Sequence, residues 1–247
     1  MAHQPIQFVH PPERSDPAEK SAIKNRILSS LPEEEFQVIQ PHLQPIDLPH
    51  HLSLYEPNQS FQFVHFPNDG LVSLVVVMSG GKTVEAGITG KEGLVGLPAL
   101  MGLDRSPLRE VVQIAGEGFR LPVNMLQGIL PSCPGFLRIA ERYAVILGLQ
   151  VAQTAGCNRL HDVEQRLARW LLMAQDRVSS PLLPITHDFL ATMLGTDRPS
   201  VSLAAGVLQK RQIIEYNRGS VKVLNRGELE KTACECYAVI RKYSSEA

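Results

Sequence analysis

Side chains that can hold phosphate groups and base edges gather in the C-terminal third of the chain. Arg198, Ser200 and Ser202 fall on the early turns of one predicted helix, and Thr186 opens the helix before it. Arg218 follows in a tight turn. A guanidinium group can form paired hydrogen bonds with guanine or phosphate, and hydroxyl groups contact bases and phosphate oxygens. This set of residues favours recognition of double-stranded DNA.

The charge distribution supports a nucleic-acid partner for one part of the chain only. The 247 residues carry a net charge of −1, but residues 1–155 carry −4 and residues 156–247 carry +3. Between Arg198 and Arg226 there are six bases and one acid, Glu215. A basic segment beside an acidic one is typical of proteins in which only the basic part meets phosphate. A solvated basic face is the alternative from charge alone.

Two short helices and a hairpin are predicted to position these side chains. Thr186 starts the first helix, Gly195 ends it, and Asp197 can cap a second helix, residues 198–210. The second helix is expected to turn four apolar residues inward: Val201, Ala204, Ala205 and Leu208. The hairpin strands are predicted at Ile213–Tyr216 and Val221–Leu224. Together these elements make a winged helix-turn-helix.

An antiparallel β-roll or barrel is predicted in the first half of the chain. Between Ile46 and Pro122, short apolar or β-branched runs alternate with Asp-Gly and Gly-Gly turns, a pattern typical of hairpins. The predicted strands are 61–66, 71–78, 83–88, 110–115 and 119–121. Residues 1–20 are predicted to be a flexible arm, and a short helix is predicted between Lys24 and Leu43, with Pro32 at a helix start.

A long helix over residues 135–156, with a break near Leu160-His161, is predicted to join the two parts. It is apolar on several faces, so it should pack on the roll and on a second helix. A strip of small side chains allows close approach of a helix or leaves room for a small molecule; it consists of Ala144, Gly148, Ala152 and Gly156. Asp162 is expected to cap the next helix. The predicted domains are therefore residues 21–156, a sensor domain, and residues 157–247, a DNA-binding domain.

The run Ile185–Val201 resembles the DNA-binding signature of the bacterial cyclic-AMP receptor protein/FNR-type (Crp/Fnr) transcription regulators. The resemblance covers about residues 25–230 and is most specific in this run. It implies an α+β fold with a jelly-roll-type β-roll like that of cyclic-nucleotide-binding domains, a long dimerisation helix and a C-terminal winged helix. It also implies a homodimer on a near-palindromic operator, with RNA polymerase as a candidate partner.

The recognition helix departs from both branches of that family. Arg198 is kept, but the Glu that often follows it is Pro199. Ser202 matches the FNR branch, whereas the Arg usual after it is Leu203. The operator cannot therefore be copied from either branch, and Arg198 is assigned to a guanine or a phosphate. The residues expected to position phosphates are Thr186, Ser200 and Arg218.

The effector site implied by the resemblance departs further. Gly96 and the pair Arg105-Ser106 align with the phosphate-binding cassette of the family, but Leu97 replaces the Glu that would hold a ribose. The long-helix positions that would contact adenine are apolar: Val151 and Ala152. Cyclic AMP is therefore not expected. Arg105-Ser106 could still bind another anion, and the alternative is that Arg105 is a surface or interdomain residue.

No metal, haem or iron–sulfur cluster is expected. The iron–sulfur branch of the family needs clustered N-terminal cysteines, whereas the first cysteine here is Cys133. Cys234 and Cys236 are predicted to lie on one helix and to point apart, so they should form a poor metal chelate and pack as unreactive side chains. His50 and His51 are likewise predicted to point apart on a strand. No paired carboxylates and no Ser/His/Asp order stand out, so no catalytic residue is predicted.

The remaining composition is that of an ordinary globular protein with a core. The sequence has no apolar segment of about 20 residues and no signal-peptide pattern, so a cytoplasmic protein is expected. The main prediction is a dimeric DNA-binding transcription regulator. Two alternatives stay open: a ligand-sensing module whose winged helix contacts protein, and an effector-free regulator controlled by its abundance.

Overall fold

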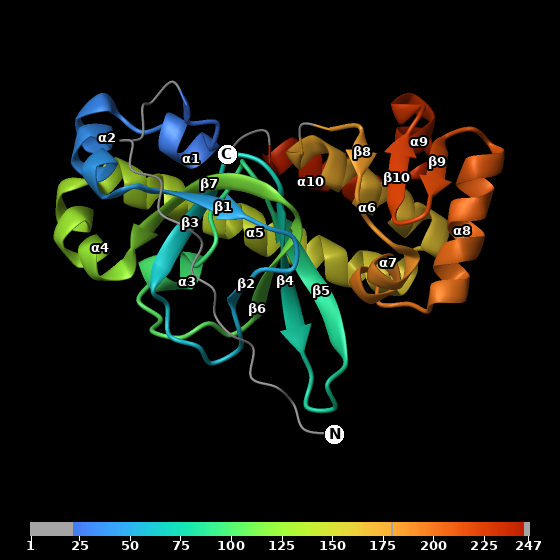
Figure 1. Cartoon of the computed structure of the whole chain (residues 1–247), viewed down its shortest axis with the longest axis horizontal. Helices are drawn as coiled ribbons and strands as arrows, with labels where there is room; N and C mark the ends of the chain where they lie inside the picture. The colour runs from blue at the N-terminus through green and yellow to red at the C-terminus, as the bar shows by residue number, and fades with distance from the viewer. Residues whose placement is uncertain (1–21, 179, 245–247) are drawn as a thin grey trace.

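The computed structural model describes residues 22–178 and 180–244, and its β-rich and helical parts are joined by one long helix (Figure 1). The predicted arm, residues 1–20, lies outside the described residues. Within the described ranges, no helix has both the length and the apolar character needed to span a bilayer. The fold combines helices and strands, and most of the strands lie in the first half of the chain, as predicted.

The predicted helix between Lys24 and Leu43 is divided in the structure. It consists of α1 (Arg26–Ser29), α2 (Glu33–Ile39) and the 3-10 turn η2 (Gln40–His42). Pro32 marks a helix start as expected, and its backbone is extended, with φ −51° and ψ 143°. Proline has no backbone donor and disfavours helical geometry in the residue before it. The two helices therefore cannot merge.

Two antiparallel sheets form the β-roll. The first has three strands, in the spatial order β1 (Gln44–Leu48), β7 (Gly116–Pro122) and β3 (Phe63–Pro67). The second has four, in the order β2 (Ser53–Tyr55), β6 (Arg109–Ile114), β4 (Leu71–Val77) and β5 (Thr83–Thr89). The antiparallel roll is thus confirmed, with two strands, β1 and β2, that were not delimited from the sequence.

Only one of the expected hairpins forms within the roll. Strands β4 and β5 pair with each other, whereas β3 and β4 lie in different sheets, as do β6 and β7. The Asp69-Gly70 turn is therefore a corner between sheets. Gly70 has φ +89°, and a Cβ at Gly116 would lie 2.2 Å from the carbonyl oxygen of Asp69. The two corners are packed together too closely for side chains, which a local turn pattern cannot reveal.

The long helix α5 (Pro134–Leu160) begins near the predicted residue and ends at the predicted break. It runs through Gly156, so the predicted domain boundary at 156 and 157 falls within its last turns. One side packs on the roll through buried residues such as Phe136 and Tyr143. Three short segments precede it: α3 (Leu97–Leu100), α4 (Val123–Ile129) and the 3-10 turn η3 (Leu130–Ser132).

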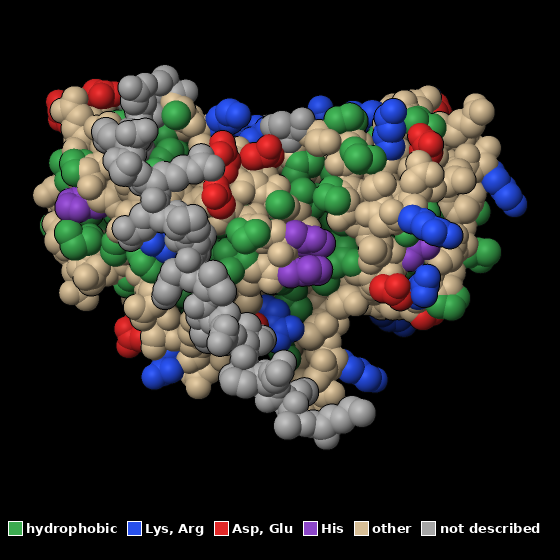
Figure 2. Space-filling view, in the orientation of Figure 1, with side chains coloured by type: hydrophobic (Ala, Val, Ile, Leu, Met, Phe, Trp, Pro, Cys, Tyr) green, Lys and Arg blue, Asp and Glu red, His purple; other side chains and the backbone are tan. Residues whose placement is uncertain are grey.

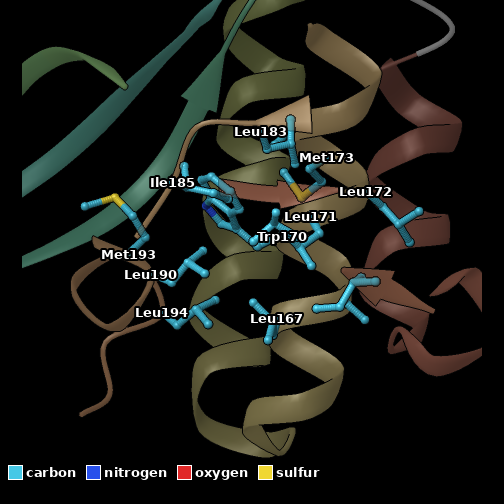
Figure 3. Close-up of a cluster of buried hydrophobic side chains, with 14 of the residues drawn as sticks. Leu167, Trp170, Leu171, Leu172, Met173, Leu183, Ile185, Leu190, Met193 and Leu194 are labelled. Carbon is cyan, nitrogen blue, oxygen red and sulfur yellow. The ribbon is translucent and has the colours of Figure 1, made fainter. Parts of the chain in front are cut away.

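The C-terminal part packs around α6 (Val163–Arg177), which is capped by the Asp162 side chain through the backbone N–H of Gln165 at 2.9 Å. Trp170 lies at the centre of this core, surrounded by side chains from α6 and α7 (Figure 3). The other elements are β8 (Leu182–Leu183), α7 (His187–Met193), α8 (Arg198–Lys210), β9 (Ile214–Asn217), β10 (Ser220–Val223), α9 (Arg226–Thr232) and α10 (Glu235–Ser244).

Buried hydrogen bonds and an ion pair connect the helical part to the roll. The indole N–H of Trp170 donates to Glu85 on β5 at 2.7 Å. The Arg177 guanidinium donates to Glu92 at 2.8 Å, and both side chains are buried. Apolar residues of β4 and β5 belong to the same core as Trp170. The two parts therefore share one packed interior, which fixes the position of the helix-turn-helix.

Candidate nucleic-acid interface and effector cradle

The helix-turn-helix is built from local signals, as predicted. The hydroxyl of Thr186 accepts from the Phe189 backbone N–H at 3.2 Å and caps α7. Gly195 takes φ +58° in the turn between the helices. The carboxylate of Asp197 accepts from the Ser200 backbone N–H at 2.8 Å and caps α8. Each helix start is stabilised within one turn of sequence.

Helix α8 has one buried face and one exposed face. The four residues predicted to point inward are all buried: Val201, Ala204, Ala205 and Leu208. Arg198, Ser202 and Leu203 are exposed, and Leu203 retains 76% of its accessible surface. A helix with such an exposed face has the dimensions and accessible groups needed to enter a major groove.

Arg198 stands at the start of α8 with a weak partner. Its Nε lies 3.5 Å from a carboxylate oxygen of Asp188, and both side chains are about two-thirds exposed, at 65% and 69%. Exposed ion pairs of this kind contribute roughly 0–1 kcal/mol. The guanidinium can therefore exchange this partner for a phosphate or a guanine at little cost.

Ser202 belongs to a small network that the sequence did not suggest. Its hydroxyl and Nδ1 of His187 are 2.9 Å apart, and the His187 ring stacks on Tyr216 of β9 with centroids 3.8 Å apart. Burial, and then the nearby Arg198 guanidinium, lower the pKa of His187 below its usual range. The ring is therefore mainly neutral at pH 7 and joins α7, α8 and the wing through one hydrogen bond and one stack.

The wing is a three-stranded sheet, one strand more than predicted. Strands β9 and β10 pair antiparallel, and β8 pairs with the outer edge of β10. Arg218 is exposed at the turn, where Gly219 takes φ +80°. Side chains of Lys and Arg project from the surface of this part of the molecule (Figure 2). The Arg218 side chain is therefore accessible to solvent, and exposed arginines can contact backbone phosphates.

The predicted effector residues Gly96 and Ser106 do come together, but around a carboxylate of the protein itself. The Gly96 backbone N–H donates to Glu110 Oε2 at 2.9 Å, and the Ser106 hydroxyl lies 3.5 Å from Glu110 Oε1. Burial raises the pKa of Glu110 to about 7. The Gly96 N–H is thus occupied by an internal acid, and the Ser106 hydroxyl donates at 2.8 Å to the Leu108 carbonyl. We call Gly96, Ser106 and Glu110 the effector cradle.

Neighbouring groups leave the cradle closed. Leu97 and Tyr55 are buried, and a Cβ at Gly96 would lie 3.0 Å from the Phe63 carbonyl oxygen and 3.6 Å from the Tyr55 ring. Arg105 is exposed and donates to the Asn58 carbonyl at 2.8 Å. The sequence-predicted Arg105 thus contacts a loop, while the unpredicted Glu110 contacts the other two residues.

Comparison with known proteins matches both the helix-turn-helix and the complete architecture. A family model for the Crp-like helix-turn-helix domain matches residues 165–232. A putative crp/fnr-family transcriptional regulator from Eubacterium rectale superposes with a TM-score of 0.65 at 14% identity, covering 84% of this chain and 97% of that one. FixK2 from Bradyrhizobium japonicum superposes with a TM-score of 0.66 at 14% identity, covering 78% of this chain and 98% of that one. No curated protein sequence matches the chain.

Residues 165–232 are therefore similar to Crp-like helix-turn-helix domains. The chain has the fold of Crp/Fnr transcription regulators, with the β-roll, long helix and C-terminal domain in the predicted order. The c-di-GMP responsive global regulator CLP of Xanthomonas campestris shares this fold, with a TM-score of 0.62 at 17% identity over 76% of this chain and 97% of that one. At these identities the likeness establishes the fold.

The basic cluster of the Crp-like domain divides into two groups. Arg211 forms an ion pair with Glu164 at 3.0 Å, and Arg226 contacts Asp176 at 2.7 Å. Arg226 also donates to Tyr237 and Glu230 and so connects α6, α9 and α10. Both arginines thus have acidic partners within the domain, and Arg226 has the larger set of contacts. The remaining bases of the cluster are exposed: Arg198, Lys210, Arg218 and Lys222.

Two predictions about paired side chains are wrong. His50 and His51 lie in the turn between β1 and β2, where His51 takes φ +67°, and their rings stack with centroids 3.7 Å apart. Cys234 precedes α10 rather than lying on it, so it does not point away from Cys236. The side chains of both cysteines join one buried cluster with Cys157.

Proposed function

We propose that this protein is a sequence-specific DNA-binding transcription regulator that inserts α8 into the major groove. The observation that carries the proposal is the exposed face of α8 in a capped helix-turn-helix, with Arg198 weakly paired. Arg198 contacts a guanine or a phosphate. Ser202, held by His187, lies beside it on the face that would meet the bases.

The phosphate contacts flank this face. Thr186 and Ser200 lie at the starts of α7 and α8, and Arg218 lies at the wing turn. Ser200 also donates to Asp197 at 3.0 Å, which orients its hydroxyl at the helix start. Helix N-termini and basic side chains are frequent partners of DNA phosphates. These residues set the register on the duplex, whereas α8 supplies sequence preference.

The working form is a homodimer that packs through α5. The exposed side of this helix carries a line of apolar and small residues that no described part of the chain covers: Val145, Leu149, Ala152, Gly156 and Leu160. Val145 and Leu160 retain 65% and 76% of their accessible surface. Among the residues that the structure describes, and apart from the chain neighbours and nearby backbone of α5 itself, no atom lies within 4 Å of a Cβ placed on Gly148 or Gly156. A second copy of α5 fits this line and gives two α8 helices for two half-sites about one DNA turn apart.

The effector cradle supports regulation without cyclic AMP. A phosphate diester would have to displace the Glu110 carboxylate from the Gly96 N–H and the Leu108 carbonyl from the Ser106 hydroxyl. It would also meet the buried Leu97, which offers a ribose no hydrogen bond. We therefore favour a regulator that is active without a cyclic nucleotide, a refinement that does not affect the DNA-binding proposal.

The first test of DNA binding is the substitution Arg198→Ala. Operator fragments are selected from genomic DNA with the wild-type protein, and binding is measured at several salt concentrations. We expect affinity to fall about 5- to 150-fold, or about 1–3 kcal/mol, with relaxed preference at one operator position. The matched control is Arg211→Ala, because Arg211 pairs with Glu164 within the domain.

Unchanged affinity and preference in Arg198→Ala would contradict the assigned role. Wild-type binding that does not weaken with salt would contradict DNA recognition itself, since release of counterions from phosphates makes binding steeply salt-dependent. That outcome would support the alternative in which the winged helix contacts protein.

The dimer is tested with Val145→Asp. A carboxylate in the middle of an apolar helix interface is desolvated without a partner, so the dimer should dissociate into monomers at micromolar concentration. Sedimentation velocity measures the change. Met78→Asp, an equivalent substitution at an exposed residue of the β4–β5 turn, should remain dimeric. A Val145→Asp protein that stays dimeric would place the interface elsewhere.

A further inference from the structure

Three cysteines and one histidine meet where α5 ends and α10 begins. The Sγ atoms of Cys157, Cys234 and Cys236 and a ring nitrogen of His161 all lie within 4.8 Å of one another. Cys157 is in the last turn of α5 and His161 directly follows that helix. Cys234 and Cys236 flank the first residue of α10. The cluster thus joins segments more than 70 residues apart in sequence.

The separations match those of a tetrahedral metal site. The Sγ atoms of Cys157 and Cys234 are 3.4 Å apart, and Cys236 Sγ is 3.6 Å from His161 Nδ1. Bonds of about 2.3 Å to sulfur and 2.0 Å to nitrogen place tetrahedral ligands about 3.5–3.8 Å from one another. An ion at the centre would need only small adjustments of the four side chains.

Groups around the cluster hold two of the ligands in place. The second ring nitrogen of His161, Nε2, lies 3.2 Å from a carboxylate oxygen of Glu235. Histidines that bind metals usually donate their other N–H in this way, which fixes the tautomer and the ring orientation. Gln153 on α5 donates from Nε2 to Cys236 Sγ at 3.2 Å. These contacts orient the histidine nitrogen and the sulfur toward the centre of the cluster.

The three cysteines are buried beside two positively charged side chains. The three cysteines are at most 4% exposed. Arg166 and Arg169 on α6 are also buried and act electrostatically on Cys157. The Nε atoms of both arginines are buried without a hydrogen-bond partner in the described structure. Three buried thiolates without a bound cation would be energetically unfavourable. A divalent ion together with the two guanidinium groups would offset their negative charge.

We propose that Cys157, His161, Cys234 and Cys236 bind a zinc ion that fastens α10 to the end of α5. Three sulfurs and one imidazole nitrogen form a complete tetrahedral set, which is the pattern of structural rather than catalytic zinc. The site fixes the C-terminal helix against the helix proposed to form the dimer. Since α10 also packs on α6, zinc sets the orientation of the helix-turn-helix relative to the dimer axis, a consequence that rests on the proposed function.

Metal content of the full-length protein tests the site without any use of DNA. Wild-type protein purified under reducing conditions should retain one zinc per chain by elemental analysis, or bind one on titration against a chromogenic chelator. Cys157→Ser and Cys234→Ser should lose the metal and melt at lower temperature. Cys133→Ser is the control, because Cys133 is buried outside the cluster and should keep full zinc content.

A surface variant separates metal binding from folding. Glu235 is 73% exposed, so Glu235→Gln should fold normally. We expect its zinc affinity to fall about 10- to 100-fold, because its carboxylate orients His161. Cobalt substitution should give the visible absorption of a tetrahedral thiolate complex in the wild type and lose it in Cys234→Ser.

Three results would overturn the proposal. The first is reduced, folded wild-type protein that neither retains nor binds zinc. The second is a Cys157–Cys234 disulfide in protein isolated under reducing conditions. The third is labile sulfide with iron in place of zinc. These readouts do not involve DNA. The zinc proposal can therefore be disproved while the DNA-binding proposal stands, and DNA binding can be disproved while the zinc proposal stands.

Discussion

The recognition face of α8 and the effector cradle of the roll differ in what their polar groups contact. On α8, Arg198 is exposed and its neighbour Asp188 is 3.5 Å away and equally exposed. In the cradle, the Gly96 N–H donates to the buried Glu110 and the Ser106 hydroxyl donates to the Leu108 carbonyl, so both donors have partners within the protein. The first surface can take a new partner at little cost, whereas the second must first release an internal one.

This contrast follows from burial. A polar group at the surface can exchange water for a ligand, but a buried donor must have a partner in the folded protein. The buried Gly96 N–H therefore needs an acceptor, and Glu110 supplies one. Residues aligned with a binding motif identify a site only when their hydrogen-bonding groups remain available.

The largest expected effect is on the pH dependence of stability in Glu110→Gln. The pKa of Glu110 is raised to about 7 in the folded protein. Its contribution to the free energy of unfolding is therefore fully present below the pKa of the unfolded state, near 4.5, and is lost as pH rises through 7. Wild-type free energy of unfolding should thus fall across this window relative to the variant, by about 2–3 kcal/mol. Urea denaturation at several pH values measures it.

The control for this prediction is Glu34→Gln, at an exposed position on α2. It should follow the wild-type pH profile. If Glu110→Gln also follows it, the cradle is not occupied by a titrating carboxylate, and the contrast with α8 disappears.

An intermediate effect is expected from Tyr216→Leu. The ring stacks on His187, which in turn contacts Ser202 on α8. Loss of such a stack costs about 0.5–1.5 kcal/mol, so the free energy of unfolding should fall by that amount and operator affinity should fall with it. Tyr243→Leu, at a half-exposed position near the end of α10, should change neither. Equal stability and operator affinity in the two variants would mean that the wing does not position the recognition face of α8.

The smallest effect is expected from Asp188→Asn, which removes the acid beside Arg198. Operator affinity should rise up to about fivefold at low salt, since the exposed pair is worth less than about 1 kcal/mol and the lost charge no longer repels phosphate. Fluorescence anisotropy over a salt series measures the gain, which should shrink as salt increases. Glu34→Gln makes the same change of charge far from α8 and should have little effect. A loss of affinity in Asp188→Asn would show that the acid positions Arg198 for binding.

The helix-turn-helix could be predicted from sequence because its signals are local. Thr186 and Asp197 cap helices within three residues of themselves, and Gly195 permits the turn between them. The spacing of apolar residues in α8 correctly predicted the four residues that are buried. Only the third wing strand, β8, was missed, because two residues without periodicity give no strand pattern.

The roll and the two buried polar clusters were decided by tertiary structure. Turn residues such as Asp69-Gly70 reverse the chain, but which strands then pair depends on contacts between distant segments. Glu110 lies 14 residues from Gly96 and meets it only because β6 returns through the roll. Cys157 and Cys234 meet across 77 residues because α10 folds back onto α5. Sequence alone determines features set by neighbours along the chain, whereas packing determines which distant side chains share a buried site and therefore what that site can bind.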